Sequence, residues 1–95
     1  MFTYNTQPGL RHIAGDLKAS AAAAVASSKA RGWMYRAIYA NIPCTIDVID
    51  SYGTVVKVTL PAGGYYLLQN HGVQTGGTTS AAAGDFNYLY DGADP

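Results

Sequence analysis

Alternating apolar and polar residues predict strands from Gly32 to the end of the chain. Over this stretch β-branched and aromatic residues dominate, and turn residues recur at short intervals. Such a pattern is typical of an all-β sandwich or barrel. The predicted strands are 33–40, 45–50, 54–60, 65–69, a short one near 73–75, and 86–90. We therefore expect a mainly β fold, a small antiparallel β-sandwich or barrel of about six strands.

The clearest local prediction is a hairpin between residues 45 and 60. Its turn is Ser51-Tyr52-Gly53, and a glycine near the tip suits a short hairpin loop with one positive φ. In the second strand Val56, Val58 and Leu60 alternate with Val55, Lys57 and Thr59. We expect these three side chains to face the core.

The segment before Gly32 has a different pattern. Residues 1–9 mix aromatics, Thr and Asn with a Pro-Gly pair and show no helical period, which predicts an extended arm. An alanine-rich stretch follows. The expected organisation is an N-terminal arm and Ala-rich helix over 1–31, followed by a β-sandwich domain over 32–95.

Helix signals bracket the alanine-rich stretch. Asp16 can cap a helix that begins at Leu17, and Gly32 fits the position just after its last residue, Arg31. The apolar face of this helix is mostly alanine and would bury little area. Two alternatives stay open: a short helix on its own sheet, or a helix or arm completed by a neighbouring subunit.

Composition narrows the classes of partner. The chain has 95 residues, and its six Lys and Arg balance six Asp to a formal net charge of zero. This balance produces no field to attract nucleic acid or an anionic membrane, so we expect neither partner. The single cysteine excludes an intrachain disulfide. Oligomerisation is the expected support for so small a domain.

No residue pattern predicts catalysis. Asp47 and Asp50 are the only close acids of the predicted sheet, and hairpin aspartates commonly face water or bind turn amides. His12 and His71 are far apart in sequence, and Cys44 has no second cysteine with which to form a zinc site. We expect no enzyme activity, no catalytic residues, no cofactor and no bound metal.

Tyrosine is the unusual feature of the composition. The chain has eight tyrosines, and this residue is enriched at interfaces because it joins a large apolar ring to a hydroxyl. One small core cannot hold every ring, so we expect a contact surface. The candidate exposed aromatic contacts are Tyr52, Tyr65 and Tyr66.

Several short motifs occur in a fixed order: GWMYRAI at 32–38, a Thr/Val hairpin, PAGGY at 61–65, TGGTTSA at 75–81 and YLYDG at 88–92. In this order the chain resembles small β-sandwich virion proteins of tailed bacteriophages over residues 32–92. The TGGTTSA motif departs from the family pattern by one extra glycine and by Ser80 before Ala81.

The resemblance implies a non-enzymatic virion structural protein. The implied role is a capsid decoration or cement protein, a homo-oligomer with a trimer favoured, which binds the major capsid protein and stabilises its lattice. It would be assembled in the host cytoplasm and located on the capsid surface. The N-terminal arm would attach it, with apolar anchors at Phe2, Tyr4, Leu10, Ile13 and Leu17.

Composition agrees with this role, because low charge and one unpaired cysteine suit a subunit that works by repeated protein contacts in a reducing cytosol. The alternative is a phage tail or spike component, or a small carbohydrate-binding module. In that case Tyr52, Tyr65 or Tyr66 would stack on host glycan.

Overall fold

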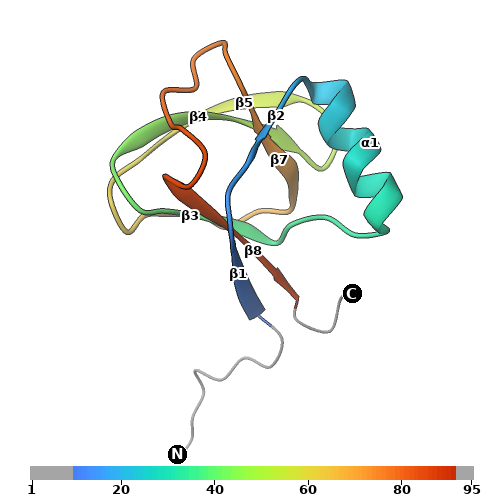
Figure 1. The fold of residues 1–95 in the computed structure, drawn as a ribbon, viewed down its shortest axis with the longest axis horizontal. Coiled ribbons are helices and arrows are strands. Elements are labelled where there is room, and N and C mark those ends of the chain that lie inside the picture. Colours follow the sequence, from blue (N-terminus) through green and yellow to red (C-terminus); the bar gives the residue numbers. More distant parts are fainter. Residues whose placement is uncertain (1–9, 92–95) are drawn as a thin grey trace, which may run out of the picture.

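Two four-stranded sheets form the body of the protein in the computed structural model, which describes residues 10–91 (Figure 1). Sheet A has the order β1 (Leu10–Ala14), β8 (Phe86–Asp91), β3 (Ala37–Ala40), β6 (Tyr65–Tyr66). Sheet B has the order β2 (Leu17–Lys18), β7 (Asn70–Gln74), β4 (Cys44–Asp50), β5 (Val55–Leu60). Neighbouring strands are antiparallel except β2 and β7. The predicted mainly β sandwich is confirmed.

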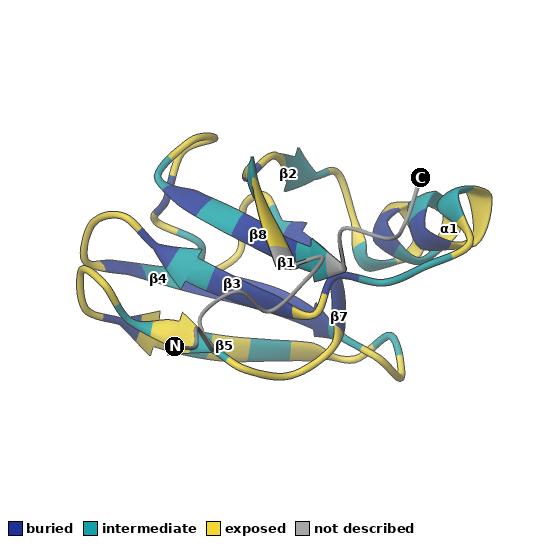
Figure 2. Cartoon of the chain, turned by 90° about the horizontal axis from the view of Figure 1, so that it is seen from below, coloured by how far each residue is buried: buried dark blue, intermediate teal, exposed yellow. Residues whose placement is uncertain are grey.

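The core lies between the sheets and draws side chains from both. Tyr88, Phe86 and Ile38 of sheet A are fully buried, as are Ile46 and Val48 of sheet B. The period of two in each strand explains this, because every second side chain faces the opposite sheet. Figure 2 shows burial concentrated in the inner strands, whereas β5 at the margin is mostly exposed or half-buried.

The predicted hairpin is confirmed. Strands β4 and β5 pair with Ile46 opposite Val58 and Val48 opposite Val56, and Gly53 has the positive φ, 84°, that its turn requires. Along β5 the side chains at 56, 58 and 60 are less exposed than those at 55, 57 and 59. The core face is the predicted one.

Two predicted strands are shorter than expected because the chain crosses there between the sheets. Tyr35 exchanges two backbone hydrogen bonds of 3.0 Å with Asn70 of sheet B, and two residues later the chain joins sheet A as β3. In the reverse direction, residues 67–69 lead from β6 to β7. The strand predicted over 65–69 therefore ends at Tyr66.

The alanine-rich helix α1 spans Ala21–Arg31, so its predicted start was wrong. Ser20, not Asp16, is the N-cap, and its Oγ accepts the N–H of Ala23 at 3.1 Å. The helix begins late because the preceding residues form β2 beside β7. Gly32 ends it as predicted, with a φ of 88°. The helix packs on β7 of its own chain, which agrees with the first of the two alternatives.

Packing does not follow the expected division at residue 31. Strand β1 pairs with β8 along its whole length, and both Ile13 and Leu17 pack against the core. From residue 10 onward the segment expected as arm and helix is thus part of the sandwich. Strand β2, which contains Leu17, has only two residues. This is too short to show an alternating period, so the sequence does not predict the strand. Of the other predicted anchors, Phe2, Tyr4 and the side chain of Leu10 lie outside the described residues.

Candidate contact surface

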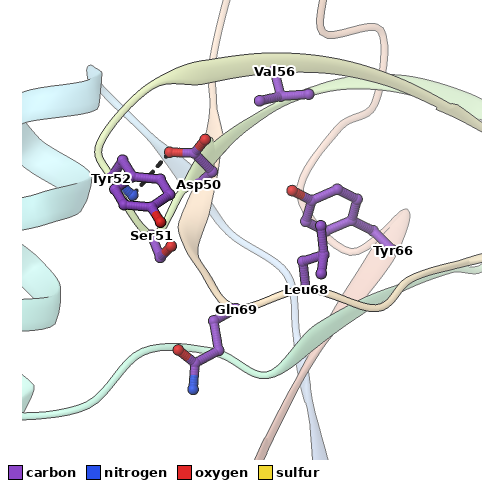
Figure 3. A pocket seen from close by; sticks show the side chains of 7 residues that line it. All are labelled: Asp50, Ser51, Tyr52, Val56, Tyr66, Leu68 and Gln69. Carbon is purple, nitrogen blue, oxygen red and sulfur yellow. Dashed lines mark hydrogen bonds between the residues drawn. The ribbon is translucent and has the colours of Figure 1, made fainter.

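The sandwich has an open lateral edge where β5 of sheet B and β6 of sheet A lie at the margins. A hollow of about 530 Å³ lies there, between Val56 of β5 and Tyr66 of β6 (Figure 3). We call it the edge pocket. Its lining consists of Asp50, Ser51, Tyr52, Val56, Tyr66, Leu68 and Gln69.

Polar groups at one end of the edge pocket are held by the hairpin turn. One carboxylate oxygen of Asp50 accepts the backbone N–H groups of Tyr52 and Thr54, both at 2.9 Å. Burial raises the pKa of the Tyr66 hydroxyl above its usual value, and the Asp50 carboxylate raises it further. Tyr66 therefore offers the pocket a neutral hydroxyl and a ring.

A second hollow, of about 520 Å³, adjoins the first on the outer face of sheet A. Its floor is Ala37 and Leu89, which are paired neighbours and alternate with core-facing residues along their strands. We call it the face pocket. Its lining consists of Arg36, Ala37, Tyr65, Leu67, Leu68, Gln69 and Leu89.

Two leucines form a ridge at these pockets. Leu67 is 73% exposed and lines only the face pocket, whereas Leu68 is 63% exposed and lines both. Four of the six exposed large hydrophobic side chains among residues 10–91 line the two pockets: Tyr52, Tyr65, Leu67 and Leu68. Apolar side chains gathered in this way mark an interaction site better than single ones do.

The three tyrosines predicted as contacts come together at this surface. Tyr52, which is 91% exposed, and the half-buried Tyr66 line the edge pocket, and Tyr65, which is 48% exposed, lines the face pocket. The exposure of the two ridge leucines was not predicted, because the sequence placed both of them in a strand over 65–69. The run of four large apolar residues Tyr65 to Leu68 was an available signal, since a half-buried strand needs only alternate ones.

A row of rings crosses the outer face of sheet A beside the face pocket. The ring of Tyr39 lies 5.9 Å from His12 and 4.9 Å from Tyr65, measured between centroids. His12 comes from β1, Tyr39 from β3 and Tyr65 from β6. Sequence reasoning did not single out Tyr39, because three strands distant in the chain build this row.

The acidic and thiol groups have structural positions. Asp47 is buried, and its carboxylate accepts the backbone N–H of Thr78 at 2.8 Å and the Thr78 hydroxyl. Cys44 is buried, and its thiol pKa is raised by burial and further by Asp85. Between residues 10 and 91, His, Cys, Asp and Glu form no group of three that could hold a metal ion.

Comparisons with known proteins add no family. No protein-family model matches the chain, and no curated protein or solved structure matches it significantly. Within the described residues, no helix has the length and apolarity needed to cross a membrane.

Proposed function

We propose that this chain is a capsid decoration protein of a tailed bacteriophage, a non-enzymatic subunit that oligomerises and stabilises the lattice of the major capsid protein. The order of motifs over residues 32–92 supports the phage class. The exposed Leu67 beside the face pocket is the observation that supports protein binding.

The chemistry of the ridge favours a protein partner. A branched aliphatic side chain has no ring face for a sugar and no hydrogen-bonding group, so water and glycan both solvate it poorly. Burying a leucine side chain contributes about 1.5–3 kcal/mol. Leu67, at 73% exposure, leaves most of this free energy available to a partner.

The many identical binding sites on a capsid shell compensate for the small interface of each copy of this chain. With a formal net charge of zero the chain has little electrostatic steering, so its binding rests on apolar contact and local concentration. A lattice offers the same surface many times, and a ligand that binds only the assembled state stabilises that state by mass action. Each copy then needs only a modest affinity.

A second candidate, glycan binding by a tail or spike component, is favoured by one observation. The His12, Tyr39 and Tyr65 rings form a continuous row on the outer face of sheet A. Aromatic faces are the stacking platforms that sugars use, and tyrosine hydroxyls add hydrogen bonds.

Occupancy on purified particles tests the proposal. We expect wild-type chain on particles of the phage that encodes it, in copy number comparable with the major capsid protein. Leu67→Asp should fold normally and be lost from the particles. The control is Ile42→Asp, which changes an equally apolar, 45% exposed side chain in the loop between β3 and β4.

One result would remove the ridge from the proposed interface, and a second would refute the capsid role. A Leu67→Asp chain that decorates particles as well as wild type removes the ridge from the interface. A wild-type chain present in only a few copies per particle places it in the tail and favours the glycan-binding candidate.

A further inference from the structure

Strand β5 has an unpaired backbone edge. It is the last strand of sheet B, and within residues 10–91 no strand pairs with its outer side. The N–H of Asp50 bonds to the carbonyl of Thr54 at 2.9 Å. Because ladder bonds alternate in an antiparallel pair, the residues that turn their N–H and C=O groups away from β4 are Val55, Lys57 and Thr59.

Hydrogen bonds on the other side of β4 confirm which residues of β5 point outward. The N–H of Thr45, opposite Thr59, bonds to Ser80 Oγ at 3.0 Å, and the N–H of Asp47 bonds to Thr79 Oγ1 at 2.9 Å. Both donors point away from β5. Their cross-strand partners must therefore point outward from β5, into the open edge.

The edge pocket lies directly beside these groups. It opens between Val56 of β5 and the side chains of Tyr66 and Leu68 (Figure 3). A strand added to β5 would direct alternate side chains into this hollow. Backbone bonds along an edge together with a pocket for alternate side chains make up the strand-addition mode of peptide binding.

Lys57 opposes the pairing of β5 with β5 of a second copy. If two β5 edges paired across a twofold axis centred on Lys57, two lysines would stand opposite each other. Like charges placed so destabilise a pair, and a lysine in an edge strand is a common protection against self-pairing. Lys57 therefore opposes self-pairing in this register, and an uncharged segment suits the edge better.

The sequence of residues 2–7 suits this position. Phe-Thr-Tyr-Asn-Thr-Gln has the same length as β5, carries no charge, and contains no Pro or Gly. Phe2 and Tyr4 are two positions apart, so in an extended strand both rings face the same side. Pro8 and Gly9 then separate this segment from β1.

The distance to β5 indicates a second copy. Strand β1 is at one margin of sheet A and β6, beside β5, is at the other, three strand spacings or roughly 14 Å away. Figures 1 and 2 both show β1 and β5 well apart. From residue 7 to residue 10 there are three Cα steps, about 11 Å at most. Residues 2–7 therefore cannot lie along β5 of their own chain.

We infer that residues 2–7 of one copy add to β5 of a second copy as a fifth strand of sheet B, with Phe2 and Tyr4 facing the edge pocket. The contact joins two different surfaces, so two copies can exchange it reciprocally, or it can repeat head to tail and close into a ring such as a trimer. The inference goes beyond the proposed function, because strand exchange needs no capsid. Its failure would leave capsid binding through Leu67 standing.

Thr59→Pro tests the exchange in the full chain. Proline removes one outward N–H without touching the ladder to β4, and Thr59→Val is the matched control because it keeps that N–H while losing the same hydroxyl. We expect light scattering to show a closed oligomer for wild type and Thr59→Val, and association weaker by about tenfold or more for Thr59→Pro.

A second variant, Phe2→Ser with Tyr4→Ser, lies outside the described sheets and covers the case that Thr59→Pro does not fold. It should also associate more weakly than wild type, and an added peptide MFTYNTQPG should protect the amides of Val55, Lys57 and Thr59 in ¹⁵N NMR spectra of this variant. An unchanged oligomer in both variants overturns the inference. So does a monomeric wild type, whether its β5 amides are protected or not.

Discussion

At the lateral edge where β1 passes into β2, hydrogen bonds tie the two sheets together, whereas at the edge of β5 and β6 two pockets and two leucines are left open. The closing bonds centre on Tyr88: its hydroxyl donates to the carbonyl of Asp16 at 2.6 Å and accepts the N–H of Val73 at 2.8 Å. Gly15 adds a bond from its N–H to the carbonyl of Phe86 at 2.8 Å. At the open edge the side chain of Leu67 is 73% exposed to water.

This difference separates stability from binding. Side chains on the closed edge have many partners, so a change there should act on the free energy of unfolding. The two leucines of the open edge are largely exposed, so a change at Leu67 or Leu68 should act on association and leave folding almost unaffected. We therefore expect the largest losses of stability from changes at the closed edge and the smallest from a change at Leu67.

Gly15→Ala, at the closed edge, should cause the largest loss in the free energy of unfolding. A Cβ at this position would stand 2.2 Å from the ring of Phe86 and 2.7 Å from its carbonyl oxygen, both in a buried residue. Overpacking of this kind costs about 3 kcal/mol. The measurement is urea unfolding, and Gly76→Ala is the control, because it meets no neighbour within 4 Å and carries only the strain of its φ of 77°. Equal losses in the two variants would show that the contact with Phe86 does not cause the destabilisation.

Tyr88→Phe should weaken the same edge without changing its shape. It leaves the buried N–H of Val73 and the carbonyl of Asp16 without their partner, which costs about 1–3 kcal/mol. The ring and its stacking on Tyr35, at 3.8 Å between centroids, remain. Urea unfolding at pH 8 measures the loss, and a variant as stable as wild type would show that the hydroxyl does not join the sheets.

The cost of losing this hydroxyl should depend on pH. Burial raises the pKa of Tyr88 far above its usual value, although the hydrogen bond from Val73 opposes the shift. In the unfolded chain tyrosine ionises near pH 10. The stability contributed by neutral Tyr88 is therefore complete below about pH 10 and is lost as pH rises toward the folded pKa. Wild type should lose stability above pH 10 more steeply than Tyr88→Phe; parallel curves would contradict this.

Lys18→Met should have a smaller effect. The Lys18 ammonium group lies 5.5 Å from the centre of the Tyr35 ring and pairs with Asp16 at 3.1 Å. Asp16 is largely exposed, so water screens the pair and the loss should be about 1 kcal/mol or less. Methionine keeps the stem that packs beside Gly72. A loss as large as that of Gly15→Ala would show that the ion pair contributes much more to the free energy of unfolding than we expect.

Leu67→Ser should have the smallest effect on stability, within about 0.5 kcal/mol of wild type. The side chain is 73% exposed and has little contact to lose. The same variant should lose particle binding. A large drop in the unfolding free energy would mean that Leu67 supports the fold and that the two edges do not differ as described.

The sequence predicted the hairpin of β4 and β5 well, because the valine period and Gly53 are local signals. It did not predict β1 or β2, because Ile13 and Leu17 are isolated apolar residues whose strands exist only through pairing with β8 and β7. For the contact surface it predicted the tyrosines by composition. The ridge at Leu67 depends on where the chain leaves sheet A, which no local period encodes.

Photo-crosslinking from position 67 during particle assembly is the most direct test of capsid binding through Leu67. A crosslinking amino acid replaces Leu67 in one chain and, as a control, Ile42 in another, and the products are identified by mass spectrometry. We expect crosslinks from position 67 to the major capsid protein and none from position 42. Crosslinks to the capsid from position 42 alone would show that Leu67 does not face the capsid.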